Sequence, residues 1–373
     1  MHRSVLLVSA LALTALRLSA AVPAAPAAGT PATPVAPAPA APTAVPGIDP
    51  VATAVWREHI EGMGDRGEGA RNVSFEQISG KALEFFERFP NERRVGGILI
   101  NLSSFGDWVK GENAAAIRAG WRLHLRKVIA DTLAGRTWPD NVWAGLHWVA
   151  ARNEIAMQMD ASGHPDLALL RQRLTTVAAR APSIHYRTFL EQEYVRGLEK
   201  YSPAELVPYL TELSKSDLTD LASLGRGQLA IQALKHTPME LTFTAVDGRK
   251  VDLAALRGQV VLIDCWATWC VPCVKELPNI KAALAKWGPK GFTVVGISFD
   301  RAAEREKLVK FIADEQLVWP HSFHESGGPN PFGQRYNLRS IPATFLLGRD
   351  GRLVTTDTHG EKLEAALAKL LGE

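Results

Sequence analysis

All three cysteines of this 373-residue chain lie in one short segment, VVLIDCWATWCVPCVKELP, from Val260 to Pro278. Cys270 and Cys273 stand where a continuous apolar run, expected to be a buried strand, gives way to a helical pattern. Two cysteines with this spacing at the start of a helix can bring their sulfurs within bonding distance. The segment therefore indicates a redox-active cysteine pair.

Cys270 is expected at the N-terminus of this helix, where unpaired N–H groups and the helix dipole stabilise a negative charge. Such a position lowers the pKa of a thiol from about 8.5 to roughly 3.5–7.5. We therefore expect Cys270 to be an exposed, nucleophilic thiolate and Cys273, one turn deeper, to be a shielded resolving thiol. The pair would attack a partner disulfide, form a mixed disulfide and release it by closing on itself.

Half of a zinc site has the same cysteine spacing, but zinc needs two further ligands. Cys265 lies on the expected strand, where alternate residues face opposite ways, and we expect it to be an inert buried side chain. No histidine pair stands at zinc-finger spacing, and His321 and His324 fall at a strand end and in a loop. We therefore expect no metal and no other cofactor at the cysteine pair.

The start of the chain is typical of an exported protein. Residues 1–20 combine an early arginine with an apolar run of about a dozen residues, whereas spanning a bilayer takes roughly 20. Residues 21–50 are rich in proline and alanine, and we expect a disordered linker there. These features predict a signal peptide and a periplasmic or otherwise extracytoplasmic location. They leave open whether the signal is cleaved or anchors the chain.

Residues 51–236 have the pattern of an all-helical domain, whose role the sequence does not indicate. Segment 114–135, for example, spaces apolar residues at three and four positions. Ser202 precedes a proline and, two residues further on, a glutamate, which predicts a helix capped by Ser202.

Residues 237–373 alternate strand and helix patterns, with Asp-Gly turns at Asp247 and Asp350. This order predicts an α/β domain with a mixed sheet flanked by helices. The formal net charge of the chain is only +3, which argues against a nucleic-acid partner.

The run Trp-Ala-Thr-Trp-Cys-x-Pro-Cys resembles the active-site segment of the thioredoxin superfamily, and its details resemble the secreted TlpA/ResA-like thiol-disulfide oxidoreductases. Pro278 matches a proline that kinks the first helix of that family. The segment RSIPATFLL, residues 339–347, matches the one that carries the family's cis-proline, which places Pro342 beside the cysteine pair. The resemblance covers about residues 239–371 and not the helical region.

This resemblance implies a thioredoxin-like fold and thiol-disulfide exchange with protein partners, with no cofactor and with a membrane-linked redox partner. Asp264 matches the buried carboxylate of thioredoxins, although TlpA-like members usually have a different residue there. A desolvated carboxyl beneath the sulfurs would have a raised pKa and could take the proton from Cys273. The alternative is an exposed aspartate at a strand end.

Glu276 lies on the same face of the expected helix as Cys273 and matches an acid typical of the TlpA-like branch. It could serve the same thiol and titrate together with Asp264. The alternative is a solvated glutamate on the helix surface.

Four residues are expected to contact the partner or tune the pair: Trp269, Pro272, Ile341 and Pro342. Trp269 would cover the thiols, whereas Trp266 is equally well explained as core. The resemblance implies a cis bond between Ile341 and Pro342 that presents a backbone edge to an extended partner segment. A trans turn proline is the alternative.

Three other functions compete with this interpretation. A peroxiredoxin-type peroxidase would need a proline and a threonine where Ile263 and Ala267 stand. A copper metallochaperone could use the two thiolates, with the helical domain as a partner-recognition module, but no histidine lies near Pro342. A pure interaction protein would not need an intact cysteine pair. We favour the oxidoreductase, and the sequence leaves the redox direction open.

Overall fold

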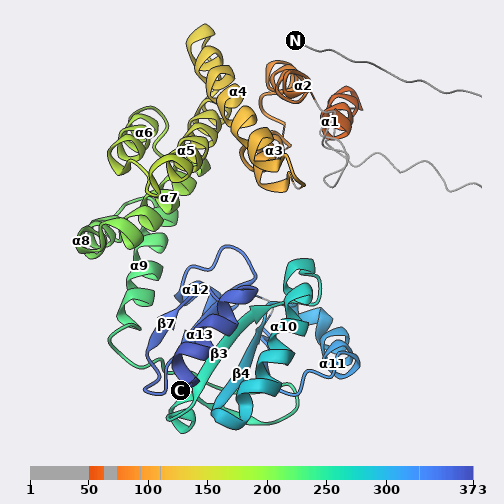
Figure 1. The fold of residues 1–373 in the computed structure, drawn as a ribbon, viewed down its shortest axis with the longest axis vertical. Coiled ribbons are helices and arrows are strands. Elements are labelled where there is room, and N and C mark those ends of the chain that lie inside the picture. Colours follow the sequence, from red (N-terminus) through yellow and green to blue (C-terminus); the bar gives the residue numbers. More distant parts are fainter. Residues whose placement is uncertain (1–49, 63–73, 93, 110, 327, 373) are drawn as a thin grey trace, which may run out of the picture. The chain divides into compact units, whose positions relative to one another are not determined.

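A computed structural model describes most of the chain after the proline- and alanine-rich segment (Figure 1). The described ranges are 50–62, 74–92, 94–109, 111–326 and 328–372. The expected signal peptide at 1–20 and all but the last residue of the expected linker therefore lie outside the described residues. Within the described ranges, no helix is long and apolar enough to cross a membrane.

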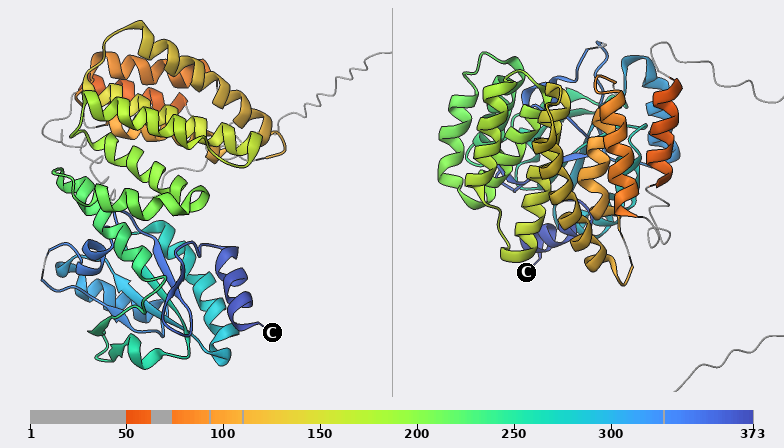
Figure 2. Two further views of the ribbon diagram at one scale, coloured as in Figure 1. Left: turned by 90° about the vertical axis from the view of Figure 1, so that its left-hand side faces the viewer. Right: turned by 90° about the horizontal axis from the view of Figure 1, so that it is seen from above.

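The N-terminal part of the described chain is helical, as predicted (Figure 2). Its helices are α1 (Pro50–Gly62), α2 (Phe75–Arg88), α3 (Val95–Trp108), α4 (Ala114–Gly135), α5 (Asp140–Ser162), α6 (Leu167–Arg180), α7 (His185–Tyr201), α8 (Pro203–Leu213) and α9 (Thr219–Ala233). Because their apolar side chains recur at helical spacing, each helix turns a buried stripe toward its neighbours.

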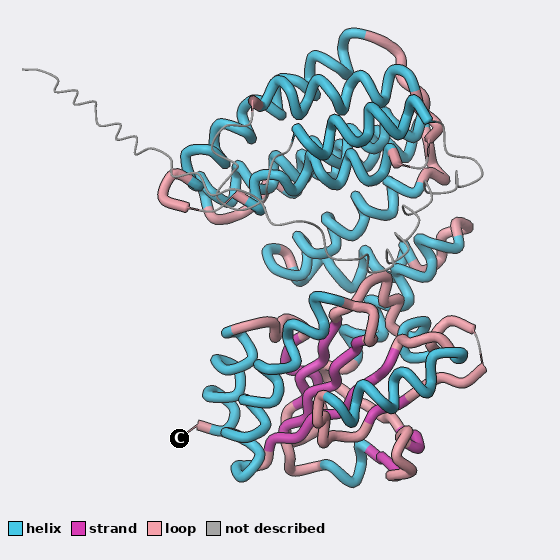
Figure 3. Tube along the Cα trace, turned by 90° about the vertical axis from the view of Figure 1, so that its right-hand side faces the viewer, coloured by secondary structure: helices cyan, strands magenta, loops and turns pink. Residues whose placement is uncertain are grey.

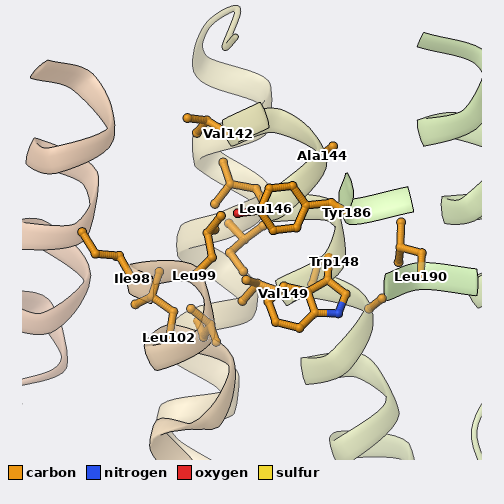
Figure 4. Packing of buried hydrophobic residues seen from close by; sticks show 14 of the residues in the cluster. Ile98, Leu99, Leu102, Val142, Ala144, Leu146, Trp148, Val149, Tyr186 and Leu190 are labelled. Carbon is orange, nitrogen blue, oxygen red and sulfur yellow. The ribbon is translucent and has the colours of Figure 1, made fainter. Parts of the chain in front are cut away.

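One apolar core holds most of these helices together. Leu99 of α3, Leu146 and Trp148 of α5 and Tyr186 of α7 meet in it, and all four are buried (Figure 4). Gly145 lets these helices approach closely, because a Cβ at that position would overlap the side chain of Leu99. A larger residue there would force the helices apart.

The C-terminal part contains a five-stranded mixed sheet, whose strands are magenta in Figure 3. The strand order is β5-β4-β3-β6-β7. Its strands are β3 (Val260–Trp266), β4 (Phe292–Ser298), β5 (His321–Ser322), β6 (Ala343–Leu347) and β7 (Leu353–Thr355). β3 is parallel to β4 and antiparallel to β6, and every residue of β3 is buried. A separate hairpin, β1 (Thr242–Thr244) and β2 (Lys250–Asp252), forms around the predicted Asp-Gly turn.

Helices cover both faces of this sheet, as predicted. They are α10 (Val271–Trp287), α11 (Arg305–Asp314), α12 (Pro331–Arg335) and α13 (Glu361–Leu371), with short 3₁₀ segments at Leu253–Leu256, Gly288–Lys290 and Ala302–Glu304. On one face, Leu262 and Trp266 of β3 pack with apolar residues of α10, α11 and α13. On the other face, Val261 and Ile263 pack with residues of α12 and with the end of α9. The observed architecture is a thioredoxin-like fold preceded by helices.

The last helix of the N-terminal part belongs to both cores. Ile231 and Leu234, at the end of α9, are buried in the same cluster as β3 residues. The Leu353 N–H of β7 donates to the Leu234 carbonyl at 2.8 Å. Gly227 lies so close to Asn337 that a Cβ there would stand 2.5 Å from the Asn337 Cβ. The domain boundary between residues 236 and 237 stays a prediction.

Candidate active site

The two cysteines three positions apart form a disulfide at the start of α10. Cys270 is the N-cap residue of this helix, and its Cα atom lies 5.2 Å from that of Cys273. The Cys273 N–H donates to the Cys270 Sγ at 3.3 Å. The N-terminus of α10 therefore directs the Cys273 N–H at the sulfur of Cys270, an arrangement that stabilises a thiolate.

Cys270 is less exposed than the sequence suggested. Its relative exposure is 4%, against 2% for Cys273, so the expectation of an exposed Cys270 is wrong for this disulfide form. The Cys270 sulfur is bonded to that of Cys273, which lies on the buried face of α10. The exposed groups beside the disulfide are instead Trp269, at 53%, and Val271, at 63%.

The loop that carries Cys270 is fastened by Asp300, which sequence reasoning missed. The Asp300 carboxylate accepts hydrogen bonds from the Thr268 N–H at 3.1 Å and from the Thr268 hydroxyl at 2.6 Å. It also accepts a bond from the Ser298 hydroxyl at 2.9 Å. Asp300 is 5% exposed, so this carboxylate is satisfied by the protein. In the sequence, Asp300 could have been noticed only because it follows the expected strand β4, which is parallel to β3.

Asp264 is buried in the middle of the sheet, 4% exposed, as its apolar neighbours predicted. Burial, and secondly the negative charge of Glu276, raise the pKa of Asp264 to about 7. Both effects disfavour the ionised carboxylate. The sequence-based expectation of a raised pKa is therefore confirmed, and the alternative of an exposed strand-end aspartate is wrong. A carboxyl with a pKa near 7 can release and accept a proton at neutral pH.

Two buried hydroxyl groups lie on the same face as Asp264. Thr344 is its direct partner in the register of β3 and β6, so the two side chains are neighbours. The Thr358 hydroxyl donates to the Thr344 hydroxyl at 2.6 Å, and Thr344 donates to the Thr356 carbonyl at 3.3 Å. Sequence patterns did not indicate this pair, because Thr358 lies in the loop between β7 and α13.

Glu276 is half-buried on α10 and connects that helix to the next one along the sheet face. One carboxylate oxygen accepts from the Gly360 N–H at 2.9 Å and from the Asn279 amide at 2.6 Å. Gly360 is the N-cap of α13, and the Asn279 amide also donates to its carbonyl at 3.0 Å. Glu276 therefore has a structural role at this junction, and its charge also acts on Asp264.

The expected partner-contact residues lie at the same end of the sheet as the disulfide. The Ile341–Pro342 bond is cis, as the resemblance implied. β6 begins directly afterwards, with Ala343 opposite Cys265 of β3, and Ile341 packs against the cluster that contains both bonded cysteines. Pro272 is exposed in the first turn of α10.

Trp266 belongs to the core and not to the surface of the site. It is fully buried, and its indole N–H donates to the His321 Nδ1 at 3.2 Å. Of the two tryptophans before Cys270, only Trp269 is exposed beside the disulfide.

Cys265 faces away from the disulfide, in the cluster on the other side of the sheet. Burial, and secondly the charge of Asp264, raise the pKa of the Cys265 thiol. A thiol in this position stays protonated and unreactive at neutral pH. Within the described ranges, no group of three or more His, Cys, Asp and Glu side chains is arranged to hold a metal ion.

The C-terminal part matches known proteins. A model of the Redoxin family matches residues 230–371. The thiol-disulfide oxidoreductase ResA of Bacillus cereus is 31% identical over 144 residues, which are 38% of this chain and 79% of that protein. This chain belongs to the thiol-disulfide oxidoreductase family. The thioredoxin-like protein YneN of Bacillus subtilis is also 31% identical, over 35% of this chain and 74% of its own length.

Solved structures align with a similar share of the chain. The thioredoxin domain of a thiol-disulfide oxidoreductase from Bacteroides vulgatus is 25% identical with a TM-score of 0.33, over 36% of this chain and 94% of that one. A thiol-disulfide oxidoreductase from Bacteroides fragilis is also 25% identical, with a TM-score of 0.33. The alignment covers 36% of this chain and 99% of that one. Helices α1 to α8 lie outside the residues that the Redoxin model matches.

Proposed function

We propose that this oxidoreductase exchanges disulfides with protein partners outside the cytoplasm, with Cys270 as the nucleophile and Cys273 as the resolving thiol. The observation that carries the proposal is the Cys270–Cys273 disulfide at the N-terminus of α10, on the same sheet face as a buried aspartate with a pKa of about 7. A helix start favours the thiolate of the first cysteine, and a nearby base can deprotonate the second.

In the reducing direction the exchange has two steps. The Cys270 thiolate attacks one sulfur of a partner disulfide, whose other sulfur leaves as a thiolate and takes up a proton. Cys273 then gives its proton to the Asp264 carboxylate and attacks the Cys270 sulfur, which breaks the mixed disulfide. The second partner sulfur leaves as a thiolate and takes up a proton from solvent, and Asp264 returns its own proton to solvent. The protein loses two electrons and the partner gains two. In the opposite direction the same steps run in reverse.

Glu276 and the partner-contact residues have roles in the same proposal. The charge of Glu276 raises the pKa of Asp264, which makes the Asp264 carboxylate a stronger base for the proton of Cys273. Trp269 and Pro272 flank the disulfide on its exposed side, and Ile341 and Pro342 present the backbone that an extended partner segment would meet.

The proposed location is the periplasm or another extracytoplasmic compartment, because residues 1–20 have the pattern of an export signal. An exported pair without a companion reductant would stay oxidised. A reducing role would therefore require a membrane-linked electron donor. No observation in the structure favours the copper-delivery alternative, and we do not propose it.

The test is to trap the mixed disulfide. Cys273→Ser in a Cys265→Ala background leaves Cys270 as the only thiol, so a complex with a partner disulfide should accumulate on non-reducing electrophoresis. Cys270→Ser in the same background should trap nothing and should abolish turnover of a disulfide substrate. If the Cys270→Ser protein traps as much partner as the Cys273→Ser protein, the assignment of the nucleophile is wrong.

A further inference from the structure

A groove opens beside Pro342, between the sheet and two helices of the N-terminal part. We call it the α7–α9 groove, and its volume is about 740 Å³. One wall comes from α7, α9 and the residues just after α9, and includes Arg196, Lys200 and Lys235. The other wall comes from residues 336–340, 342–345, 353–357 and 359 (α7, α9 and β7 are labelled in Figure 1). The helical region therefore forms one side of a groove whose other side contains the cis-proline.

The groove reaches the cis-proline that the proposed function places in the partner-binding site. Pro342 lines it, and the preceding residue, Ile341, packs against the apolar cluster that includes Cys270 and Cys273. Val354 of the edge strand β7 also lines it and is 46% exposed. A partner segment whose cysteine reached the disulfide past Pro342 could continue into this groove.

Hydrogen bonds and ion pairs hold the walls in place without any ligand. The Glu199 carboxylate of α7 accepts bonds from Gln232 and Lys235, both at 3.0 Å, which fixes α7 to the end of α9. Arg339 donates to the Asp220 carbonyl of α9 at 3.2 Å, which fixes α9 to the loop before Pro342. A preformed groove loses less conformational freedom when a partner binds.

The charges of the groove are unbalanced. Its charged lining residues are Arg196, Glu199, Lys200, Lys235, Arg339 and Asp357. Four are basic and two acidic, a difference of +2. Both acids have ion-pair partners, Lys235 and Lys362. Two of the bases, Arg196 and Arg339, pair with Glu193 and Asp220, which lie outside the lining. Lys200 forms no ion pair with the part of the chain that the structure describes; its ammonium lies 5.0 Å from the centre of the Tyr201 ring. Its charge is available to a ligand.

We propose that the α7–α9 groove binds an extended, acidic segment of the partner protein that flanks the partner's reactive cysteine. The inference rests on the proposed function and names the partner class of that same site. Lys200, which has no ion pair among the described residues, is the main contact for that segment, and Arg196, exposed one turn earlier on α7, would exchange its ion pair with Glu193 for one with the partner. Opposite charge across such a surface speeds association and selects partners. The chain's own segment 20–47 does not fit this requirement, since it carries no charged residue.

The experiment compares two symmetrical peptide disulfides as oxidants of the reduced, full-length protein. One peptide is Gly-Glu-Glu-Gly-Cys-Gly-Glu-Glu-Gly and the other has glutamine in place of every glutamate. In each reaction two protein thiols become one disulfide, and one peptide disulfide becomes two peptide thiols, which are separated by chromatography after an acid quench. Hydroxyethyl disulfide, a small neutral oxidant, reports the chemistry of the cysteine pair by itself.

Wild type should reduce the acidic peptide several-fold faster than the glutamine peptide at low salt. The double variant Arg196→Gln, Lys200→Gln should bring that ratio close to one, since it removes both exposed positive charges of α7 from the groove. Raising the salt to about 0.5 M should lower the ratio in wild type as well. The double variant Arg126→Gln, Lys127→Gln removes the same charge from exposed positions on α4 and should keep the ratio.

The outcomes separate the two proposals. If hydroxyethyl disulfide and both peptides fail to oxidise the protein, the proposed function is wrong. If all three react but the ratio is one, or if the α4 control lowers it as much as the groove variant does, the groove proposal is overturned and the proposed function stands. As a second arm, a fluorescent acidic peptide with serine in place of cysteine should bind the oxidised protein with higher anisotropy than its glutamine counterpart. Equal binding of the two would also contradict the groove.

Discussion

At the scale of single residues, Asp264 lowers the free energy of unfolding at neutral pH and, in the proposed mechanism, accepts a proton. Its carboxyl group is 4% exposed and has a pKa of about 7, whereas an ordinary aspartate titrates near 3.8. Between these two values the folded protein holds a proton that the unfolded chain has lost. The free energy of unfolding must therefore fall as the pH rises from about 4 to about 7, and the full penalty applies above that range.

Asp264→Asn removes the titration and keeps the shape of the side chain. The variant should be more stable than wild type above pH 7, by on the order of a few kcal/mol, and the difference should shrink toward pH 4. Urea unfolding of the two oxidised proteins across this pH range measures the difference in their free energies of unfolding. A difference that is the same at pH 4.5 and pH 8 would mean that the Asp264 pKa is not raised.

The same variant should slow disulfide exchange, because Cys273 loses its proton acceptor. The rate of wild type should rise through about pH 7, and this rise should be absent in Asp264→Asn. An unchanged pH–rate profile would remove Asp264 from the mechanism while leaving its effect on stability intact.

At the scale of elements, the site depends on how the ends of β3 and β4 are joined. Asp300, after β4, binds both the N–H and the hydroxyl of Thr268, two residues before Cys270. The N-cap position of Cys270 is therefore set by a contact between neighbouring strand ends, in addition to the capping geometry of α10 itself.

Asp300→Asn should lower the free energy of unfolding by about 1–3 kcal/mol, because an amide cannot accept every bond that the buried carboxylate accepts. It should also slow exchange at Cys270. The matched control is Asp314→Asn, which removes an exposed ion pair with Lys310 on α11 and should cost less than about 1 kcal/mol. Equal losses in the two variants would show that Asp300 does not hold the loop.

Most of these elements could be predicted because their patterns are local. The buried strand before Cys270, the Asp-Gly hairpins and the helix at Ala114–Gly135 follow from periodicity and turn residues. Helix α12 could not be recognised, since its five residues are too few to show a period. The expected cap at Ser202 is wrong: Ser202 begins α8 without a side-chain hydrogen bond, and it also ends α7, where its N–H bonds to the Leu198 carbonyl.

The site was predictable to the same extent. The cysteine pair and Asp264 lie in one segment, and the apolar residues around Asp264 imply its burial. Asp300, Thr358 and the α7 side of the groove are distant in sequence and meet the site only through the fold. Their chemistry gives no signal without the sheet order.

At the scale of the whole molecule, α9 connects the helical part to the oxidoreductase part. Gly227 makes that contact possible, since a Cβ there would lie 2.5 Å from the Asn337 Cβ and 2.9 Å from the Asn337 nitrogen. Because α9 also forms one wall of the α7–α9 groove, its seating on the sheet affects both stability and the proposed partner site.

Gly227→Ala should therefore loosen α9 and destabilise the protein by about 1–3 kcal/mol. Hydrogen exchange at the Leu353 N–H, which bonds to the Leu234 carbonyl, should become faster. Gly80→Ala on α2 is the matched control: nothing lies within 4 Å of a Cβ there, so the change should stabilise its helix by up to about 1 kcal/mol. Faster exchange at Leu353 in the Gly80 variant as well would contradict the assignment.

The bond from Leu353 to Leu234 has a further effect on how these molecules behave in a crowded compartment. An uncovered edge strand offers unpaired N–H and C=O groups to which a strand of a second molecule can bind. Here the Leu234 carbonyl at the end of α9 binds one N–H of the edge strand β7, and the opposite edge strand, β5, is only two residues long. Few backbone groups at the edges of this sheet are therefore available to start fibril formation between copies, even at high protein concentration.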